Sequence, residues 1–253
     1  MKHHLTPGTV VLVGGGPGDP DLITVAGLRA VQQADVVVYD RLAPLAVLDE
    51  MRPDAERIAV GKIPRGACTP QDRINEILID QARAGRRVVR LKGGDNFVFG
   101  RGGEESQACA LAGVPVEVVP GVTSAVAVPA LAGVPVTHRS LSQGFTVVSG
   151  HVPPGDPRST IPWEALARTH TTLVVLMGVA HLAAICAALT GAGLDPATPA
   201  AVVEDGCGPR SRVVRGTVSD VATLAADADV QPPAITVIGA VAGLDLTPEW
   251  TAC

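Results

Sequence analysis

The sequence predicts an α/β fold built as two α/β domains with mostly parallel or mixed sheets. Short runs rich in β-branched residues alternate with longer amphipathic runs along the whole chain. Several of the short runs end in glycine-rich segments, which is how strand ends present backbone amides to a ligand. The chain has 253 residues and is 47% hydrophobic, enough for one large domain or two smaller ones. Strands and helices that alternate in this way indicate helix-covered, mostly parallel sheets.

The first half of the chain contains the clearest helix signals. Thr24 is a good N-cap for a helix over 24–33, and Gly85 is a good C-terminal stop for a helix over 69–84. That second helix begins with Thr69-Pro70-Gln71-Asp72, a capping Thr followed by an early Pro and an acidic residue. The expected strands here are 9–13, 35–39, 57–60, 87–91 and 115–118, and the expected helices are 24–33, 43–51, 69–84 and 102–112.

The second half repeats the alternation without a sequence repeat, so we expect a second α/β unit. A domain boundary is predicted within 133–143, which gives a first domain over 1–138 and a second over 139–253. The expected strands are 145–149, 172–177, 200–204, 213–216 and 234–239, and the expected helices are 179–190 and 219–226.

Composition excludes several classes of partner. The formal net charge is −5 and the chain holds only six aromatic residues, which disfavours nucleic-acid and anionic-membrane partners. No apolar run approaches 18 residues, and the start of the chain lacks the apolar segment of a secretory signal. The five cysteines are widely spaced without zinc-ligand spacing, which favours reduced thiols and no metal. We therefore expect a soluble, cytoplasmic protein.

The segment from Val13 to Thr24 follows the first strand and contains three consecutive glycines. It is not a dinucleotide fingerprint, because that motif would need glycine at Asp19, and no Lys-Ser/Thr pair makes it a P-loop. Ligand contact is therefore favoured over a simple turn. Asp40 and Lys62 follow the next two strands, and an acid and a base there could meet at one sheet edge. Turn capping by Asp40 and simple solvation of Lys62 remain alternatives.

The most informative stretch runs from Leu91 to Glu105. Gly93 and Gly94 follow the strand over 87–91 and allow close backbone approach or positive φ, while Asp95 can accept from a hydroxyl or an amine. Thr123 and Ser124 follow the fifth strand, where they could cap a helix or hold a ligand. Structural roles stay open for His138 at the domain junction and for Met177 at a strand end.

The chain resembles the tetrapyrrole methylase family, and within it the uroporphyrinogen-III C-methyltransferase branch. The resemblance rests on motifs in one order over about 9–239: Gly14-x-Gly-Pro-Gly-Asp, Tyr39-Asp-Arg-Leu, Val60-Gly-Lys, Leu91-Lys-Gly-Gly-Asp with Phe-Val-Phe-Gly-Arg-Gly-Gly-Glu-Glu, Val119-Pro-Gly-Val-Thr-Ser, Val134-Pro-Val-Thr-His-Arg, Met177-Gly and Val213-Val-Arg-Gly. The segment ending in Gly-Arg-Gly-Gly-Glu-Glu is specific to this branch, whereas Gly-Pro-Gly-Asp marks only the wider family.

This resemblance implies an active-site cleft between two α/β domains, a homodimer, and S-adenosylmethionine as methyl donor. The implied reaction methylates uroporphyrinogen III at C2 and C7 to give precorrin-2, which feeds sirohaem and cobalamin synthesis. Asp40 matches the family's proton acceptor and Lys62 its proton donor. The matching donor-site residues are Pro17, Gly93, Gly94, Asp95, Val98, Thr123, Ser124, Met177 and Gly206.

The acceptor carries eight carboxylates, so an acidic protein needs local cations to bind it. We expect Arg41, Arg101, His138 and Arg139 to bind these carboxylates, with Lys62 and Arg65 as further candidates, because arginine can pair with a carboxylate through two bonds.

Three features depart from the family pattern. Asn96 stands where proline is common, which we expect to loosen the loop, and Ala67-Cys68 replaces a usual polar pair. The dehydrogenase/chelatase half that some relatives carry in front is also absent here, which suggests a monofunctional enzyme.

Other functions remain as alternatives. A methylase of a later corrin intermediate and an RNA-modifying relative share the fold. A nicotinamide-dependent oxidoreductase is disfavoured by the missing fingerprint, and a non-catalytic tetrapyrrole-binding module would follow if the departures abolish turnover.

Overall fold

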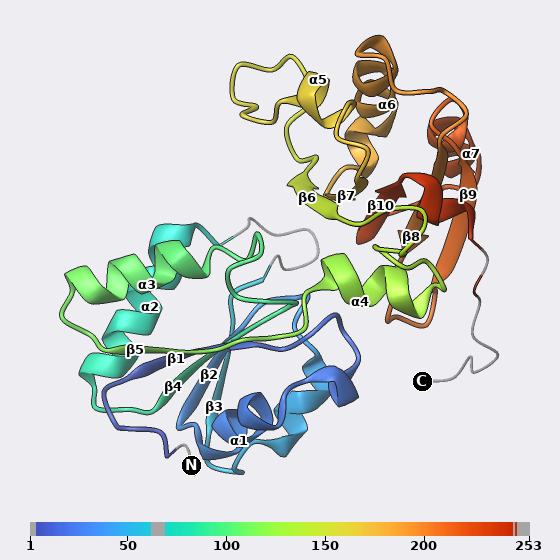
Figure 1. The fold of residues 1–253 in the computed structure, drawn as a ribbon. Helices are drawn as coiled ribbons and strands as arrows, with labels where there is room; N and C mark the ends of the chain where they lie inside the picture. Colours follow the sequence, from blue (N-terminus) through green and yellow to red (C-terminus); the bar gives the residue numbers. More distant parts are fainter. Residues whose placement is uncertain (1–3, 62–68, 245, 247–253) are drawn as a thin grey trace. The chain divides into compact units, whose positions relative to one another are not determined.

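The computed structural model describes residues 4–61, 69–244 and 246, and the chain divides into two compact units (Figure 1). The units are Met1–Ser124 and Ala125–Cys253. Both are α/β units, so the predicted fold class is confirmed. The division lies before the boundary expected after residue 138. The reason is that Ala125 and Val128 pack against Val174 and Leu176 of the second unit's sheet.

The first unit is a five-stranded, fully parallel sheet with strand order β3-β2-β4-β1-β5. The strands are β1 (Val10–Gly14), β2 (Val36–Tyr39), β3 (Glu56–Ala59), β4 (Val88–Lys92) and β5 (Val116–Val119). The connecting elements are η1 (Pro20–Leu22), α1 (Val25–Gln33), η2 (Leu45–Glu50), α2 (Gln71–Arg83) and α3 (Gly102–Leu111).

Both faces of this sheet are covered, which explains the near-continuous valine runs in its central strands. On one face, Val11, Val37 and Val89 pack with residues of α1 and η2. On the other face, Val10, Val36 and Val88 pack with residues of α2 and α3. Figure 1 shows α2 and α3 on one side of the sheet and α1 on the other. The alternation of side chains along each strand therefore sends even-numbered residues of β4 towards α2 and α3.

The second unit is a mixed sheet with strand order β6-β7-β10-β8-β9, in which only the β6–β7 pair is parallel. Its strands are β6 (Phe145–Ser149), β7 (Thr172–Leu176), β8 (Pro199–Glu204), β9 (Arg212–Thr217) and β10 (Ala234–Ile238). Its helical elements are α4 (Ser124–Leu131), α5 (Trp163–Leu166), η3 (Val179–His181), α6 (Leu182–Gly191), α7 (Val221–Asp227) and η4 (Ala240–Gly243).

Local signals succeed at some element ends and fail at others. Thr24 caps α1 by accepting from the Gly27 amide at 3.1 Å. Gly85 follows the C-cap of α2 with a φ of +76°, so both predictions are confirmed. The predicted cap by Thr69 is wrong, because Pro70 occupies the N-cap position of α2. The expected helix over 43–51 is instead the 3₁₀ segment η2.

Candidate functional site

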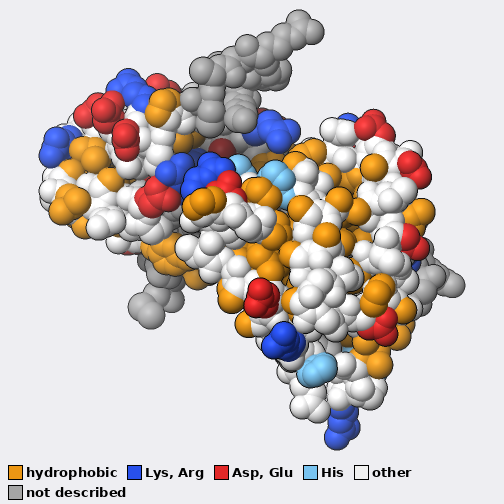
Figure 2. Space-filling view, turned by 90° about the horizontal axis from the view of Figure 1, so that it is seen from above, with side chains coloured by type: hydrophobic (Ala, Val, Ile, Leu, Met, Phe, Trp, Pro, Cys, Tyr) orange, Lys and Arg blue, Asp and Glu red, His pale blue; other side chains and the backbone are white. Residues whose placement is uncertain are grey.

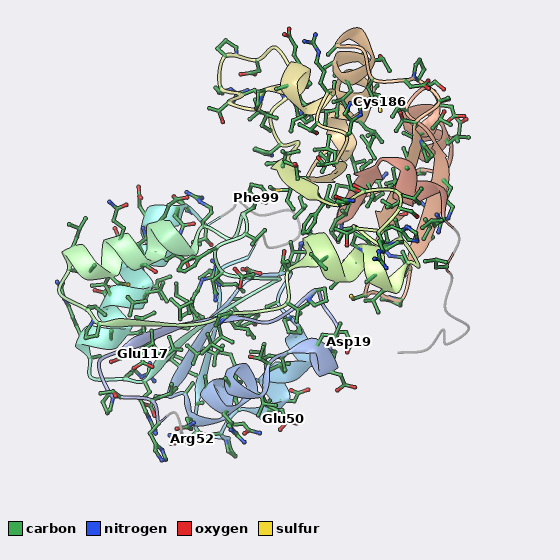
Figure 3. All side chains as sticks on the ribbon, in the orientation of Figure 1. Asp19, Glu50, Arg52, Phe99, Glu117 and Cys186 are labelled. Carbon is green, nitrogen blue, oxygen red and sulfur yellow. The ribbon has the colours of Figure 1, made fainter. Side chains whose placement is uncertain are left out.

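The loops after β1, β2, β4 and β5 meet at one edge of the first unit's sheet, because all four strands point the same way. Figure 3 marks this edge by Asp19 and Phe99, whereas Arg52 lies at the opposite edge. Ten of the residues predicted for the site lie in these loops or at the helix that follows β5. They are Pro17, Asp40, Arg41, Gly93, Gly94, Asp95, Val98, Arg101, Thr123 and Ser124.

Glycines at this edge allow backbones to cross at distances that no side chain would permit. A Cβ on Gly14 would lie 2.5 Å from the Gly121 nitrogen, and one on Gly121 would lie 2.3 Å from the Gly94 carbonyl oxygen. A Cβ on Gly93 would lie 2.4 Å from the Leu42 carbonyl oxygen. The glycine pattern therefore builds the tight packing of these loops, in addition to any contact with a ligand.

Gly94 is buried, and it differs from its neighbours because an added Cβ would make only ordinary van der Waals contacts. It forms a reciprocal backbone pair with Gly16, with N···O distances of 2.6 and 3.1 Å. Its φ is +66°, and a Cβ there would meet only the Ser124 nitrogen at 3.7 Å and Oγ at 3.8 Å. The Gly94 backbone therefore packs beside the polar atoms of Ser124, at the start of α4.

Asp95 ties two of the loops together. Its Oδ1 accepts from the Phe97 amide at 2.9 Å, and its Oδ2 accepts from the Gly121 amide at 3.0 Å. Each carboxylate oxygen retains further acceptor capacity for a ligand. The first role that the geometry gives to Asp95 is therefore to fix the loops after β4 and β5 against each other.

Asn96, one of the departures from the family pattern, is fully buried. Its Nδ2 donates to the carbonyl oxygens of Val119 at 2.8 Å and of Leu12 at 3.4 Å. Its backbone carbonyl accepts from the Gly102 amide at 3.0 Å. The side chain thus joins β1 to the end of β5, and the backbone carbonyl holds the start of α3, so Asn96 cross-links the loop that we expected it to loosen.

Asp40 follows β2 and is partly exposed, with 28% of its side chain accessible. Its Oδ1 accepts from the Leu42 amide at 3.1 Å, and its Oδ2 pairs with the Arg90 guanidinium at 3.3 Å. Arg41 beside it is exposed. Lys62, Arg65, Ala67 and Cys68 lie outside the described residues. Asp40 thus combines a fixed carboxylate with access to a ligand.

Sequence reasoning missed a buried group of charges beneath Asp40. Lys92 donates to both oxygens of Glu105 at 2.9 Å each, and Arg90 donates to the same carboxylate at 3.0 Å. All three side chains are almost completely buried. Burial, followed by the nearby Arg90 charge, lowers the pKa of Lys92. The sequence signal for this group was the occurrence of Arg90 and Lys92 at alternate positions of β4, a strand that is otherwise apolar.

Arg101 begins α3 with a left-handed backbone, at a φ of +59°. Its guanidinium pairs with Glu104 through two bonds of 2.8 and 2.5 Å, and about half of each side chain is exposed. This hydrogen bond holds the pKa of the Glu104 carboxyl below its ordinary value. A ligand carboxylate that binds Arg101 therefore shares this guanidinium with Glu104.

The remaining predicted residues lie in the second unit. Met177 follows β7 with a φ of +58° and has 49% of its surface exposed. A Cβ on Gly206 would lie 2.3 Å from Val128 Cγ1, so this glycine also serves close packing. His138 contacts Ser140 Oγ through Nδ1 at 3.0 Å, and both His138 and Arg139 are exposed.

Arg139 lines an open hollow of about 500 Å³ in the second unit. The loop from Arg139 to Gly144 forms one wall and Thr169–Thr171 the other. On the face drawn in Figure 2, Lys and Arg side chains occur in small groups beside Asp and Glu rather than as one continuous basic surface. On this face, cations are therefore available locally but form no continuous basic surface.

Three cysteines are described, and all three are free thiols: Cys109, Cys186 and Cys207. Burial raises the pKa of Cys109 and of Cys186, in α6, to about 11. Within the described ranges, His, Cys, Asp and Glu side chains form no cluster of three or more suited to a metal ion. The helices of the described segments are all too short or too polar to cross a membrane.

The residues at the sheet edge fit an amino-acid nucleoside such as S-adenosylmethionine. Ser124, a half-buried residue, offers a backbone amide and a hydroxyl beside the Gly94 backbone. Asp95 holds acceptor oxygens in a fixed place. These are the groups that bind carboxylates, amines and ribose hydroxyls.

Comparison with known proteins agrees with this geometry. Residues 9–222 match the model of the family described as Tetrapyrrole (Corrin/Porphyrin) Methylases. A siroheme synthase of Pseudomonas putida (strain W619) is 47% identical over 243 residues, which are 96% of this chain and 52% of that protein. The chain thus spans about half the length of the curated relatives it matches.

Two solved structures are also similar. The uroporphyrin-III C-methyltransferase of Thermus thermophilus, complexed with S-adenosylhomocysteine, has a TM-score of 0.78 and 42% identity, over 93% of each chain. A cobalt-precorrin-4 methyltransferase has a TM-score of 0.81 and 29% identity, over 94% of this chain and 97% of that one. On the family match and these identities, the chain belongs to the tetrapyrrole methylase family.

Proposed function

We propose that this chain is an S-adenosylmethionine-dependent C-methyltransferase that methylates uroporphyrinogen III at C2 and C7 to give precorrin-2. The observation that carries the proposal is the 42% identity, over 93% of both chains, to a uroporphyrin-III C-methyltransferase solved with S-adenosylhomocysteine. The siroheme synthases among the relatives support sirohaem as one destination of the product, with cobalamin as another.

The donor supplies a methyl group on a sulfonium, which is transferred by in-line displacement. The chain's part is to hold donor and acceptor in line, which replaces an encounter in solution by a fixed geometry. The polar atoms of Ser124, which lie beside the Gly94 backbone, and the carboxylate of Asp95 support this role. Pro17, Gly93, Val98, Thr123, Met177 and Gly206 complete the proposed donor site.

The acceptor's pyrrole carbons are electron-rich and act as nucleophiles. One carbon–carbon bond forms as the methyl–sulfur bond breaks, and the cationic macrocycle then loses a proton. We assign proton acceptance to Asp40, whose carboxylate is fixed by Leu42 and Arg90 yet remains accessible. Lys62 is proposed as the proton donor. Replacement of Asp40 by Asn should lower turnover while donor binding persists, and full activity of D40N would end this assignment.

The acceptor's carboxylates need cations that a ligand can reach from water. Arg41, Arg101, His138 and Arg139 are all exposed, and arginine can bind a carboxylate through two parallel bonds. We also propose that the enzyme is a homodimer and works in the cytoplasm, as its branch of the family suggests.

A second candidate is a methylase of a later corrin intermediate. The TM-score to a cobalt-precorrin-4 methyltransferase is 0.81, against 0.78 to the uroporphyrin-III C-methyltransferase. Backbone shape therefore supports this candidate as well as the first. Sequence identity does separate them, at 42% against 29%. The early acceptor is therefore the better-supported one.

A comparison of three methyl acceptors, each tested separately, tests the proposal. The protein is incubated without oxygen with labelled S-adenosylmethionine and either uroporphyrinogen III, a precorrin-4-type corrin or ribosomal RNA. We expect label in precorrin-2 and none in the other two acceptors. Label in the corrin alone would support the second candidate, and label in RNA alone would show an RNA-modifying relative.

A further inference from the structure

The buried charges of β4 and α3 take no direct part in the reaction described above, although one of them, Arg90, contacts its proposed base. We propose that Arg90 is a positioning residue, which holds the Asp40 carboxylate in its reactive orientation and is itself fixed by Glu105 and Lys92. This inference rests on the proposed function, because it concerns the same reaction.

Arg90 lies in the central strand of the first sheet, and 3% of its side chain is exposed. Its NH1 donates to the carbonyl oxygens of Leu91 at 3.1 Å and Val38 at 3.4 Å. Its Nε donates to Glu105 at 3.0 Å, which leaves NH2 directed at Asp40 Oδ2 at 3.3 Å. Because the guanidinium is planar, bonds on one side of the group fix the direction of the other.

Glu105 anchors this arrangement from the first turns of α3. Its carboxylate is completely buried and accepts from Arg90, Lys92 and Gln71, the last at 3.3 Å. A buried carboxylate held by two cations is costly to disturb, since removal of one partner leaves an uncompensated charge. Burial, followed by the Arg90 charge, lowers the pKa of Lys92, and Glu105 opposes this shift.

Charge balance links the cluster to Asp40. Arg90 and Lys92 carry two positive charges, and Glu105 supplies one negative charge among the buried members. Asp40 supplies the second negative charge at the exposed end of the group. The Asp40 carboxylate is therefore held towards Arg90 by attraction, while the Leu42 amide holds its other oxygen.

Lysine cannot replace arginine in this role. An ammonium group at position 90 can still pair with Glu105, but it lacks the planar fork that reaches two carboxylates in fixed directions. Arg90→Lys therefore keeps the buried charge and removes the orientation of Asp40. The same substitution in Arg87, one residue before β4, is a matched control, because Arg87 pairs with Asp35 at the other end of the strand.

The test is a double-mutant cycle on single-turnover methylation of uroporphyrinogen III, with R90K, D40N and the double variant. We expect R90K to slow methylation about tenfold to a hundredfold, the range in which small misplacements of a reacting group fall. We expect R90K to change the rate less than about twofold when Asp40 is already Asn, since the two act as one unit. R87K should leave the rate unchanged.

Several results would overturn the inference. An equal loss from R90K in both backgrounds would show that Arg90 does not act through Asp40, and an unchanged rate in R90K would show no role. Calorimetry with S-adenosylhomocysteine and a urea unfolding curve establish that each variant is folded and binds the donor. If R90K does not fold, Glu105→Gln is tested in the same cycle, with the same expected pattern. Absence of methylation by the wild-type chain would instead overturn the proposed function.

Discussion

Asp35 shows how a single carboxylate can join two strands of the first sheet. Its oxygens accept from the Arg87 amide at 2.8 Å, from the Arg87 guanidinium at 3.0 and 2.6 Å, and from Arg52 at 3.0 Å. The Arg87 hydrogen bonds hold the pKa of Asp35 well below its ordinary value, although burial opposes the shift. The carboxylate thus ties the start of β2 to the residue before β4.

Asp35→Asn should lower the free energy of unfolding by about 2 kcal/mol at neutral pH, a typical value for hydrogen bonds to a charged group. An acid whose pKa is lowered by folding stabilises the protein above its unfolded pKa of about 3.9, and this stabilisation is lost as pH falls below it. Urea unfolding at a series of pH values measures both variants. The difference between them should shrink below about pH 4, and a constant difference would contradict the assignment.

Single residues also show where sequence reasoning stops. The β-branched strand runs and the motif order predicted the positions of Asp40, Gly94 and Ser124 at one sheet edge. The burial of Asn96 could not be predicted, since an Asn in a glycine-rich loop is normally a solvated turn residue. The Arg101–Glu104 pair could have been found from its spacing of three residues within a helix start.

At the scale of elements, the glycine-containing loops after β1, β4 and β5 pack against one another as one unit. Gly121→Ala should destabilise the protein and weaken donor binding, because its Cβ would lie 2.3 Å from the Gly94 carbonyl oxygen and must displace backbone. Gly103→Ala is the matched control in α3, where an added Cβ meets nothing within 4 Å. It should stabilise the protein by up to about 1 kcal/mol through helix propensity.

Urea unfolding of both variants measures this contrast. Gly121→Ala should shift the unfolding midpoint to lower urea concentration and Gly103→Ala to equal or higher concentration. If both glycines tolerate alanine equally, the close crossing of the loops does not occur in solution.

Element prediction succeeded where the local sequence decides the outcome. The strand over 145–149 and the capped start of α1 were predicted correctly, because alternation and a capping Thr are local signals. The pairing of the second sheet is not a local property. Strand order β6-β7-β10-β8-β9 brings the last strand between two earlier ones, and only tertiary packing specifies it.

At the scale of the whole molecule, the account requires that the folded chain is stabilised by the methyl donor and by the thioether nucleoside that remains after methyl transfer. S-adenosylhomocysteine at 100 times its dissociation constant should raise the free energy of unfolding by about 2.7 kcal/mol. A urea titration with and without this ligand measures the shift. A nicotinamide dinucleotide at equal concentration is the control and should have no effect. The opposite ranking would favour an oxidoreductase.

The two-unit architecture followed from length and from the alternation of strands and helices. Its division at Ser124 did not follow, because a helix that begins in a glycine loop can pack on either unit, and α4 packs on the second sheet. The proposed chemistry of the site was predicted from the order of the motifs and not from composition. A net charge of −5 does not indicate that the proposed acceptor is a polyanion.

The number of methyl groups transferred to each uroporphyrinogen III molecule tests the central claim most directly. The protein is given an excess of labelled S-adenosylmethionine, and the tetrapyrrole product is isolated and its labelled positions are mapped. We predict two labelled methyl groups, at C2 and C7. A product without label, or a label at other ring positions only, would contradict the account.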